Sequence, residues 1–173
     1  LISRGGIVAF SFVKCAGNRI DQAITDYVKK THNLAIGDKM AEDVKIEIGS
    51  AVPLEEEIAM VVKGRDYLTG LPRSVDMTTN EVVRAVSKEL RTMINAIKDV
   101  LQETPPELAA DIIDHGITLT GGSSQLRNLA ELVFRRTGVK ARVAKDPQYC
   151  VAKGTGEVIK HLDVSKKAII AKR

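Results

Sequence analysis

The residues best suited to bind a ligand form a glycine and serine turn in the C-terminal half of the chain. An apolar segment, Ile117–Leu119, precedes Gly121 and Gly122, and the chain continues through Ser123 and Ser124 into an amphipathic stretch. Glycines after a strand let the backbone approach a ligand closely, and a following helix offers unpaired N–H groups and the positive end of its dipole. This pattern is typical of a site for an anion or a nucleotide.

The same turn has an ordinary structural explanation. A strand, a glycine turn and a helix also reverse the chain in any α/β domain. The turn lacks the lysine and the spacing of a P-loop, and Gly121 with Gly122 does not make the three-glycine dinucleotide fingerprint. The spacing alone therefore leaves both interpretations open.

Glu42 and Lys45 are the second pair of residues that we consider for binding. They lie three positions apart in an expected helix over residues 38–48 and share one of its faces. On spacing alone, a solvated salt bridge is the favoured interpretation.

Cysteine and histidine residues form no pattern for metal binding or catalysis. Cys15 and Cys150 lie far apart and match no metal-binding or redox spacing. The three histidines, which are isolated in the sequence, are His32, His115 and His161. We therefore expect two free thiols in a reducing cytoplasm, no metal site and no catalytic residue in this chain.

Composition excludes several classes of function. The 173 residues are 44% hydrophobic and 28% charged, as in soluble globular proteins. With no Trp, three Tyr and three Phe, a base-stacking surface for nucleic acid is not expected. No apolar run approaches the roughly 20 residues that span a bilayer. The net charge of +4 comes partly from the basic end, residues 153–173, which could touch an acidic partner or lipid headgroups.

Hydrophobic periodicity predicts an α/β protein. A starting hairpin is expected, in which Val8, Phe10 and Phe12 alternate on a second strand that ends near residue 16. The expected helices cover residues 18–30, 38–48, 79–104, 108–114, 125–137 and 151–162, and the later strands cover 57–63, 73–77, 117–120 and 139–144. The chain starts within a strand, without an initiator Met, so we expect a fragment.

The order of these elements predicts two lobes. The starting hairpin and the βαβα order at the end could share one sheet. Residues 18–104 then form an insertion with its own small sheet and a long helix, which Pro105 and Pro106 end.

Several short motifs occur in the same order in one known family. They are residues 41–51 (AEDVKIEIGSA), 63–66 (KGRD), 69–72 (TGLP), 104–112 (TPPELAADI), 119–122 (LTGG) and 146–147 (DP). With them, the chain resembles the C-terminal half of the MreB family, the bacterial actin homologues that determine rod shape. The resemblance runs from Leu1 to about Asp163.

The resemblance implies the second domain of an actin-like ATPase of ribonuclease H-like fold. This domain has a mixed sheet with flanking helices and a smaller inserted α+β subdomain. Residues 1–17 and 105–173 would be subdomain IIA, and residues 18–104 would be subdomain IIB. The parent protein would be a filament-forming cytoskeletal ATPase that self-associates and binds ATP or ADP, with Mg in the full-length protein.

The resemblance also implies a binding site for the adenosine part of the nucleotide between the two subdomains. Carried over position by position, the contacts from the glycine turn are Gly121, Gly122, Ser123, Ser124 and Gln125. The contacts from the IIB helix are Glu42, Asp43, Val44 and Lys45. On this basis the pair Glu42 and Lys45 becomes a clamp for ribose and adenine.

The chain departs from the family pattern at informative positions. Ser123 stands where the family commonly has a third glycine, and Ala16-Gly17-Asn18 stands for Gly-Gly-Asp. The phosphate loops, the catalytic acidic residue and the first domain would lie upstream of Leu1. The resemblance therefore predicts that this chain alone has no ATPase activity.

Two alternatives remain open. In the family, IIA docks a membrane-anchored partner, RodZ, and the basic end could extend such a surface. An Hsp70-like or sugar-kinase relative is less favoured, because those families carry larger or different IIB insertions. Membrane attachment in the MreB family comes through the N-terminal half, so we expect no direct membrane contact here, a cytoplasmic location, and membrane association only for the full-length protein.

Overall fold

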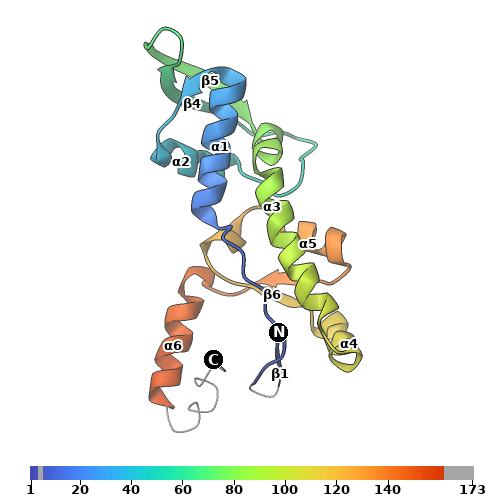
Figure 1. Ribbon diagram of the computed structural model, residues 1–173. Helices are drawn as coiled ribbons and strands as arrows, with labels where there is room; N and C mark the ends of the chain where they lie inside the picture. The colour runs from blue at the N-terminus through green and yellow to red at the C-terminus, as the bar shows by residue number, and fades with distance from the viewer. Residues whose placement is uncertain (4–5, 162–173) are drawn as a thin grey trace.

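The computed structural model describes residues 1–3 and 6–161, in which helices alternate with short strands (Figure 1). The helical elements are α1 (Gly17–His32), α2 (Asp38–Ile48), α3 (Thr79–Gln102), α4 (Pro106–His115), η1 (Gly122–Gln125), α5 (Leu129–Thr137), η2 (Pro147–Tyr149) and α6 (Cys150–Lys160). The strands are β1 (Ile2–Ser3), β2 (Gly6–Ile7), β3 (Leu34–Ala35), β4 (Ala59–Asp66), β5 (Pro72–Thr78), β6 (Ile117–Leu119) and β7 (Ala141–Val143). Most of the basic end, residues 162–173, lies outside the described residues.

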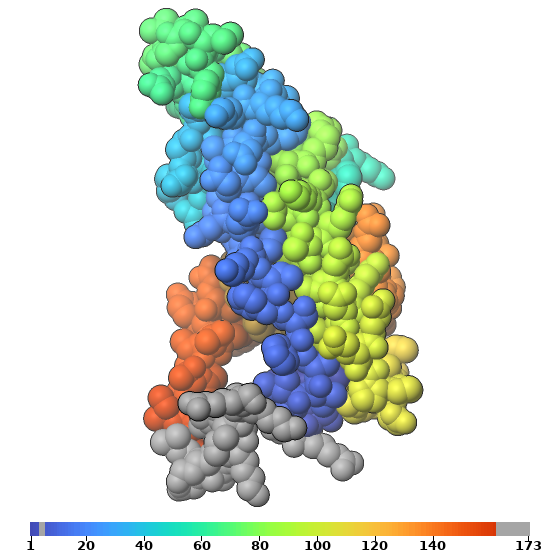
Figure 2. Space-filling view, in the orientation of Figure 1, coloured from blue at the N-terminus to red at the C-terminus, as the bar shows by residue number. Residues whose placement is uncertain are grey.

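The main core lies where α1, α2 and α3 pack together. Ile20, Ile24 and Val28 recur every four residues along α1 and are buried, as the sequence predicted. Val44 of α2 and Val86 of α3 are fully buried in the same core. Figure 2 shows α1 and α3 lying along one another on one face of the molecule.

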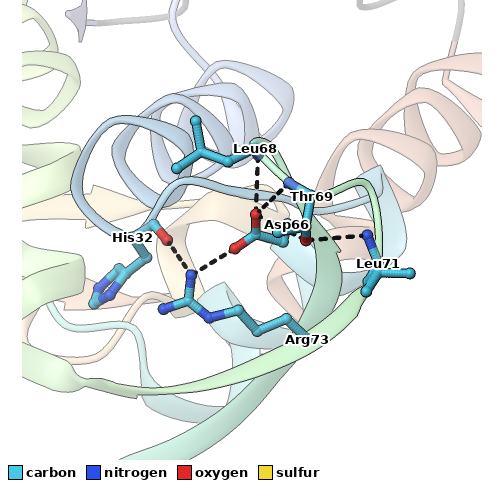
Figure 3. Close-up of polar contacts among 6 residues, drawn as sticks. All are labelled: His32, Asp66, Leu68, Thr69, Leu71 and Arg73. Atoms are coloured by element: carbon cyan, nitrogen blue, oxygen red, sulfur yellow. Dashed lines mark hydrogen bonds and ion pairs between the residues drawn. The ribbon is translucent and has the colours of Figure 1, made fainter.

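An antiparallel sheet in the order β3-β4-β5 closes one end of this core. The turn that joins β4 to β5 is structured by Asp66, whose carboxylate accepts the N–H groups of Leu68 and Thr69, both at 2.9 Å (Figure 3). Arg73 donates to the same carboxylate at 2.8 Å and to the His32 carbonyl at 3.3 Å. The Thr69 N–H, then the Arg73 guanidinium and the Leu68 N–H, lower the pKa of Asp66 to about 2.

Helix α3 connects the two ends of the molecule (Figure 1). It begins with the predicted capping box, in which the Glu81 carboxylate accepts the Thr78 N–H at 3.0 Å. Glu81 Oε1 also lies 2.9 Å from His32 Nε2 at the end of α1. Pro106 begins α4 shortly after α3 ends, as expected for a proline that cannot continue the helix.

The predicted starting hairpin is much shorter in the structure. Strand β2 ends at Ile7, and the Val8 N–H donates to the Leu1 carbonyl at 3.0 Å. Phe10 and Phe12 are exposed and lie outside any strand, so the prediction of a strand to residue 16 was wrong. An extended segment needs a hydrogen-bonded neighbour, and among the described residues no strand pairs with residues 10–16.

The described strands do not join the two ends of the chain in one sheet. The antiparallel pair β1-β2 and the parallel pair β6-β7 are separate. Helix α5 packs against β7, and α4 leads into β6. None of the helices in the described part of the chain has the length and apolar content that a bilayer crossing requires.

Candidate functional site

A cavity of about 510 Å³ lies between α1, α2 and the glycine turn. Five of the nine residues predicted to contact adenosine line it: Glu42, Lys45, Gly122, Ser123 and Gln125. The first two come from α2, and the others belong to η1, far away in the sequence. The fold thus brings together the two segments that the sequence singled out.

Lys45 is held in the wall of this cavity by Asp21 of α1. Lys45 Nζ donates to Asp21 Oδ2 at 3.0 Å and lies 2.8 Å from Oδ1, and both side chains are 19% exposed. Gly17 lies beside Lys45 and Ser123: a Cβ built at this position would be 3.5 Å from Lys45 Nζ and 3.7 Å from Ser123 Oγ. The start of α1, α2 and the glycine turn therefore meet at one point.

The sequence reasoning missed Asp21, which holds Lys45 without lining the cavity itself, and most of the residues that do line it. The further lining residues are Gly17, Asn18, Ile20, Ile46, Gly49, Leu126, Arg127 and Gln148. Asn18 had a signal, as a departure from the family pattern, and Gln148 directly follows the Asp-Pro motif. Asp21 had no such signal in the sequence, because its partner Lys45 is 24 positions away.

Four predicted contact residues do not line the cavity. Val44 is fully buried in the core, and Asp43 pairs with Lys39 at 2.8 Å. Ser124 donates its hydroxyl to the Gly121 carbonyl at 2.7 Å, and Gly121 has a φ of 84°, which favours glycine. Gly121 and Ser124 shape the turn that carries the lining residues Gly122 and Ser123.

The glycine turn does not lead directly into an α-helix. Residues Gly122–Gln125 form the 3₁₀ turn η1, and α5 begins only at Leu129, so the predicted helix start near residue 125 was wrong. Asn128, with a φ of 60°, adopts the left-handed conformation that asparagine tolerates and that interrupts a helix. The dipole of a full α-helix therefore does not start at this turn.

Side chains around the cavity offer both hydrogen-bond donors and acceptors. Gln148 Nε2 donates to Gln125 Oε1 at 3.2 Å, which links η2 to η1. The Glu42 carboxylate is half exposed, and Arg127 donates to the Glu47 carbonyl at 3.5 Å. Such a lining suits a ligand that combines a polar heterocycle with hydroxyl groups.

No arrangement for nucleophilic or metal chemistry accompanies the cavity. Its lining contains no histidine or cysteine. Cys15 lies elsewhere, where burial and the Glu89 carboxylate raise its pKa to about 11, so the thiol stays protonated at neutral pH. Across residues 1–3 and 6–161, no three His, Cys, Asp or Glu side chains gather closely enough to hold a metal ion.

Solved structures with the same architecture define the class of protein. MreB 5 of Spiroplasma citri, crystallised bound to AMPPNP and also bound to ADP, superposes with a TM-score of 0.83 in the AMPPNP form, at 35% identity over 90% of this chain and 46% of that chain. The MamK double helical filament gives a TM-score of 0.66 at 25% identity over 79% of this chain and 42% of that chain. The fold is that of the actin-like proteins.

Sequence comparison narrows this class to one family. The family model for MreB/Mbl protein matches residues 1–167. The cell shape-determining protein MreB of Escherichia coli is 40% identical over 164 residues, which cover 95% of this chain and 47% of the relative. The chain belongs to the MreB/Mbl family. It spans about half the length of the curated relatives that it matches.

Proposed function

We propose that this chain is the lobe of a filament-forming, cell shape-determining ATPase that binds the adenosine part of ATP or ADP. The observation that supports this most strongly is the cavity in which Glu42 and Lys45 face the segment of Gly122, Ser123 and Gln125. The crystallised relative that was bound to AMPPNP and to ADP adds support.

Each side chain has a role that follows from its chemistry. The Glu42 carboxylate accepts hydrogen bonds from ribose hydroxyls, and the Lys45 ammonium donates to oxygen acceptors of the nucleoside. Gly122 lets the backbone approach the adenine ring, and Ser123 adds a hydroxyl at its edge. ATP with Mg would supply the phosphate chemistry, for which we assign no residue of this chain.

The division into subdomains is part of the proposal. We assign residues 18–104 to IIB, because α1, α2, α3 and the β3-β4-β5 sheet supply most of one core, which Leu129 of α5 also joins. Residues 1–17 and 105–173 are assigned to IIA. Self-association of the parent protein is proposed from the family, with support from the filament formed by MamK.

Calorimetric titration with ADP tests the site. We expect Lys45→Gln to weaken ADP binding at least about tenfold, because a charge-assisted hydrogen bond contributes roughly 1.5–3 kcal/mol. Gly122→Val should weaken it further by filling the cavity. The control is Lys30→Gln, which removes the same charge from an exposed site of α1 outside the cavity. The proposal fails if wild type does not bind ADP or if Lys45→Gln binds like the control.

The second predicted function, docking of a RodZ-like membrane-anchored partner on IIA, stays a prediction. The basic end on which it partly rests lies mostly outside the described residues. The cytoplasmic location and the lack of ATPase activity in this chain alone also stay predictions. The lack of ATPase activity is checked by incubating the purified chain with ATP and Mg and measuring phosphate release. We expect this release to equal that of a sample without protein.

A further inference from the structure

A second cavity, of about 590 Å³, lies between α3 and α5. These helices lie side by side in Figure 1. Four cationic residues line it, Arg91 and Lys98 from α3 and Arg135 and Arg136 from α5, and no Asp or Glu residue does. We call it the basic groove. It shares no lining residue with the cavity between α1, α2 and the glycine turn, so the two sites are separate.

Most of this positive charge has no partner within the described part of the chain. Arg135 forms an ion pair with Glu131 of the same helix, at 2.6 Å. No ion pair in the described ranges involves Arg91, Lys98 or Arg136. Like charges gathered in one groove repel each other, so an anionic ligand that neutralises them is favoured.

The shape of the basic groove indicates an extended ligand. Its α3 wall runs from Val83 to Lys98, which corresponds to about 22 Å at 1.5 Å per residue. Ser87 and Asn95 add hydrogen-bonding groups along this wall, whereas Leu90 and Ile94 form an apolar floor. A ligand of about four helical turns, with acidic and apolar side chains on one face, would match this length and pattern.

We propose that the basic groove binds an acidic peptide segment of a partner protein in helical form. A nucleic acid fits less well, because no aromatic residue lines the groove for base stacking. A membrane fits less well, because a flat bilayer surface does not reach the buried floor at Leu90 and Ile94. Since α3 and α5 both line the groove, such a peptide would contact both helices.

Fluorescence polarisation with a labelled peptide of about 16 residues tests the proposal, because this length spans the α3 wall at 1.5 Å per residue. The peptide carries Glu and Leu at helical spacing, and its counterpart carries Gln in place of Glu. We expect the chain to bind the Glu peptide at least about tenfold more tightly than the Gln peptide. Binding should weaken as salt is raised, because exposed charges are screened.

Charge reversal locates the binding. The double variant Arg91→Glu with Lys98→Glu should lower the affinity at least about tenfold. The matched control, Lys88→Glu with Lys140→Glu, makes the same change in net charge at exposed positions on α3 and after α5, outside the groove, and should stay within about twofold of wild type. Circular dichroism confirms that each variant is folded.

Four results would overturn the proposal. Equal binding of the Glu and Gln peptides would show that charge is not recognised, and equal losses in the two double variants would show attraction by net charge alone. The groove would belong to another ligand if inorganic polyphosphate or anionic phosphatidylserine vesicles bound more tightly than the peptide and lost this binding in the groove variant. Sedimentation equilibrium provides the fourth: self-association that only the groove variant loses would identify a second copy as the occupant.

Discussion

Removal of the Asp21 carboxylate tests how Lys45 is held in the cavity between α1, α2 and the glycine turn. At the observed 2.8 Å, two unit charges attract each other by about 1.5 kcal/mol in water and about 6 kcal/mol at an effective dielectric constant of 20. Because both side chains are only 19% exposed, desolvation offsets a large part of this attraction. We therefore expect Asp21→Asn to lower the free energy of unfolding by about 1.5–3 kcal/mol, the range for hydrogen bonds to charged groups.

A double-mutant cycle isolates this pair. Asp21→Asn, Lys45→Gln and the double variant are unfolded in urea, and the coupling energy is compared with that of Lys39 and Asp43. That second pair is also 2.8 Å apart but more exposed, at 78% and 33%, so its coupling should be only about 0.3–0.5 kcal/mol. The reasoning is refuted if the coupling of Asp21 with Lys45 is no larger than that of the exposed pair.

Three further predictions concern stability. Gly49→Ala should lower the free energy of unfolding by about 1–3 kcal/mol in urea titrations, because a Cβ there would collide with the Lys45 carbonyl oxygen. Ile24→Ala should cost about 2–5 kcal/mol in the same assay, since the Ile24 side chain is fully buried. Asp66→Asn should destabilise the folded protein at pH 7. Because the folded pKa of Asp66, about 2, lies below its usual 3.8, the difference from wild type in thermal unfolding should vanish between about pH 4 and pH 2.

Local rules predicted the elements of the main core. The bounds of α2, residues 38–48, and the buried stripe of α1 follow from apolar residues recurring with the period of a helix. The capping box of Thr78 and Glu81 involves residues three positions apart, so it could be predicted from the sequence in the same way. Such features depend on neighbours within one or two turns, so the chain carries them in its linear order.

Predictions failed where the outcome depended on a distant partner. Val8, Phe10 and Phe12 alternate as in a strand, yet β2 ends at Ile7 and no described strand pairs with residues 10–16. The amphipathic stretch after Gly122 was expected to be one helix, but Leu126–Asn128 lie between η1 and α5. In the first case the described part of the chain offers no partner strand. In the second, the Arg127 carbonyl accepts the N–H of the distant Ala51 at 2.8 Å.

The sequence by itself determined the family resemblance, the helices of the core and the two segments with binding chemistry. The family resemblance implied that Glu42 and Lys45 meet the glycine turn at one site. Only the tertiary structure decided that Asp21 holds Lys45 and that cations of α3 and α5 line one groove. The physical reason is that hydrophobic periodicity acts over a few residues, whereas a contact between distant residues exists only once the packed core has set the path of the backbone.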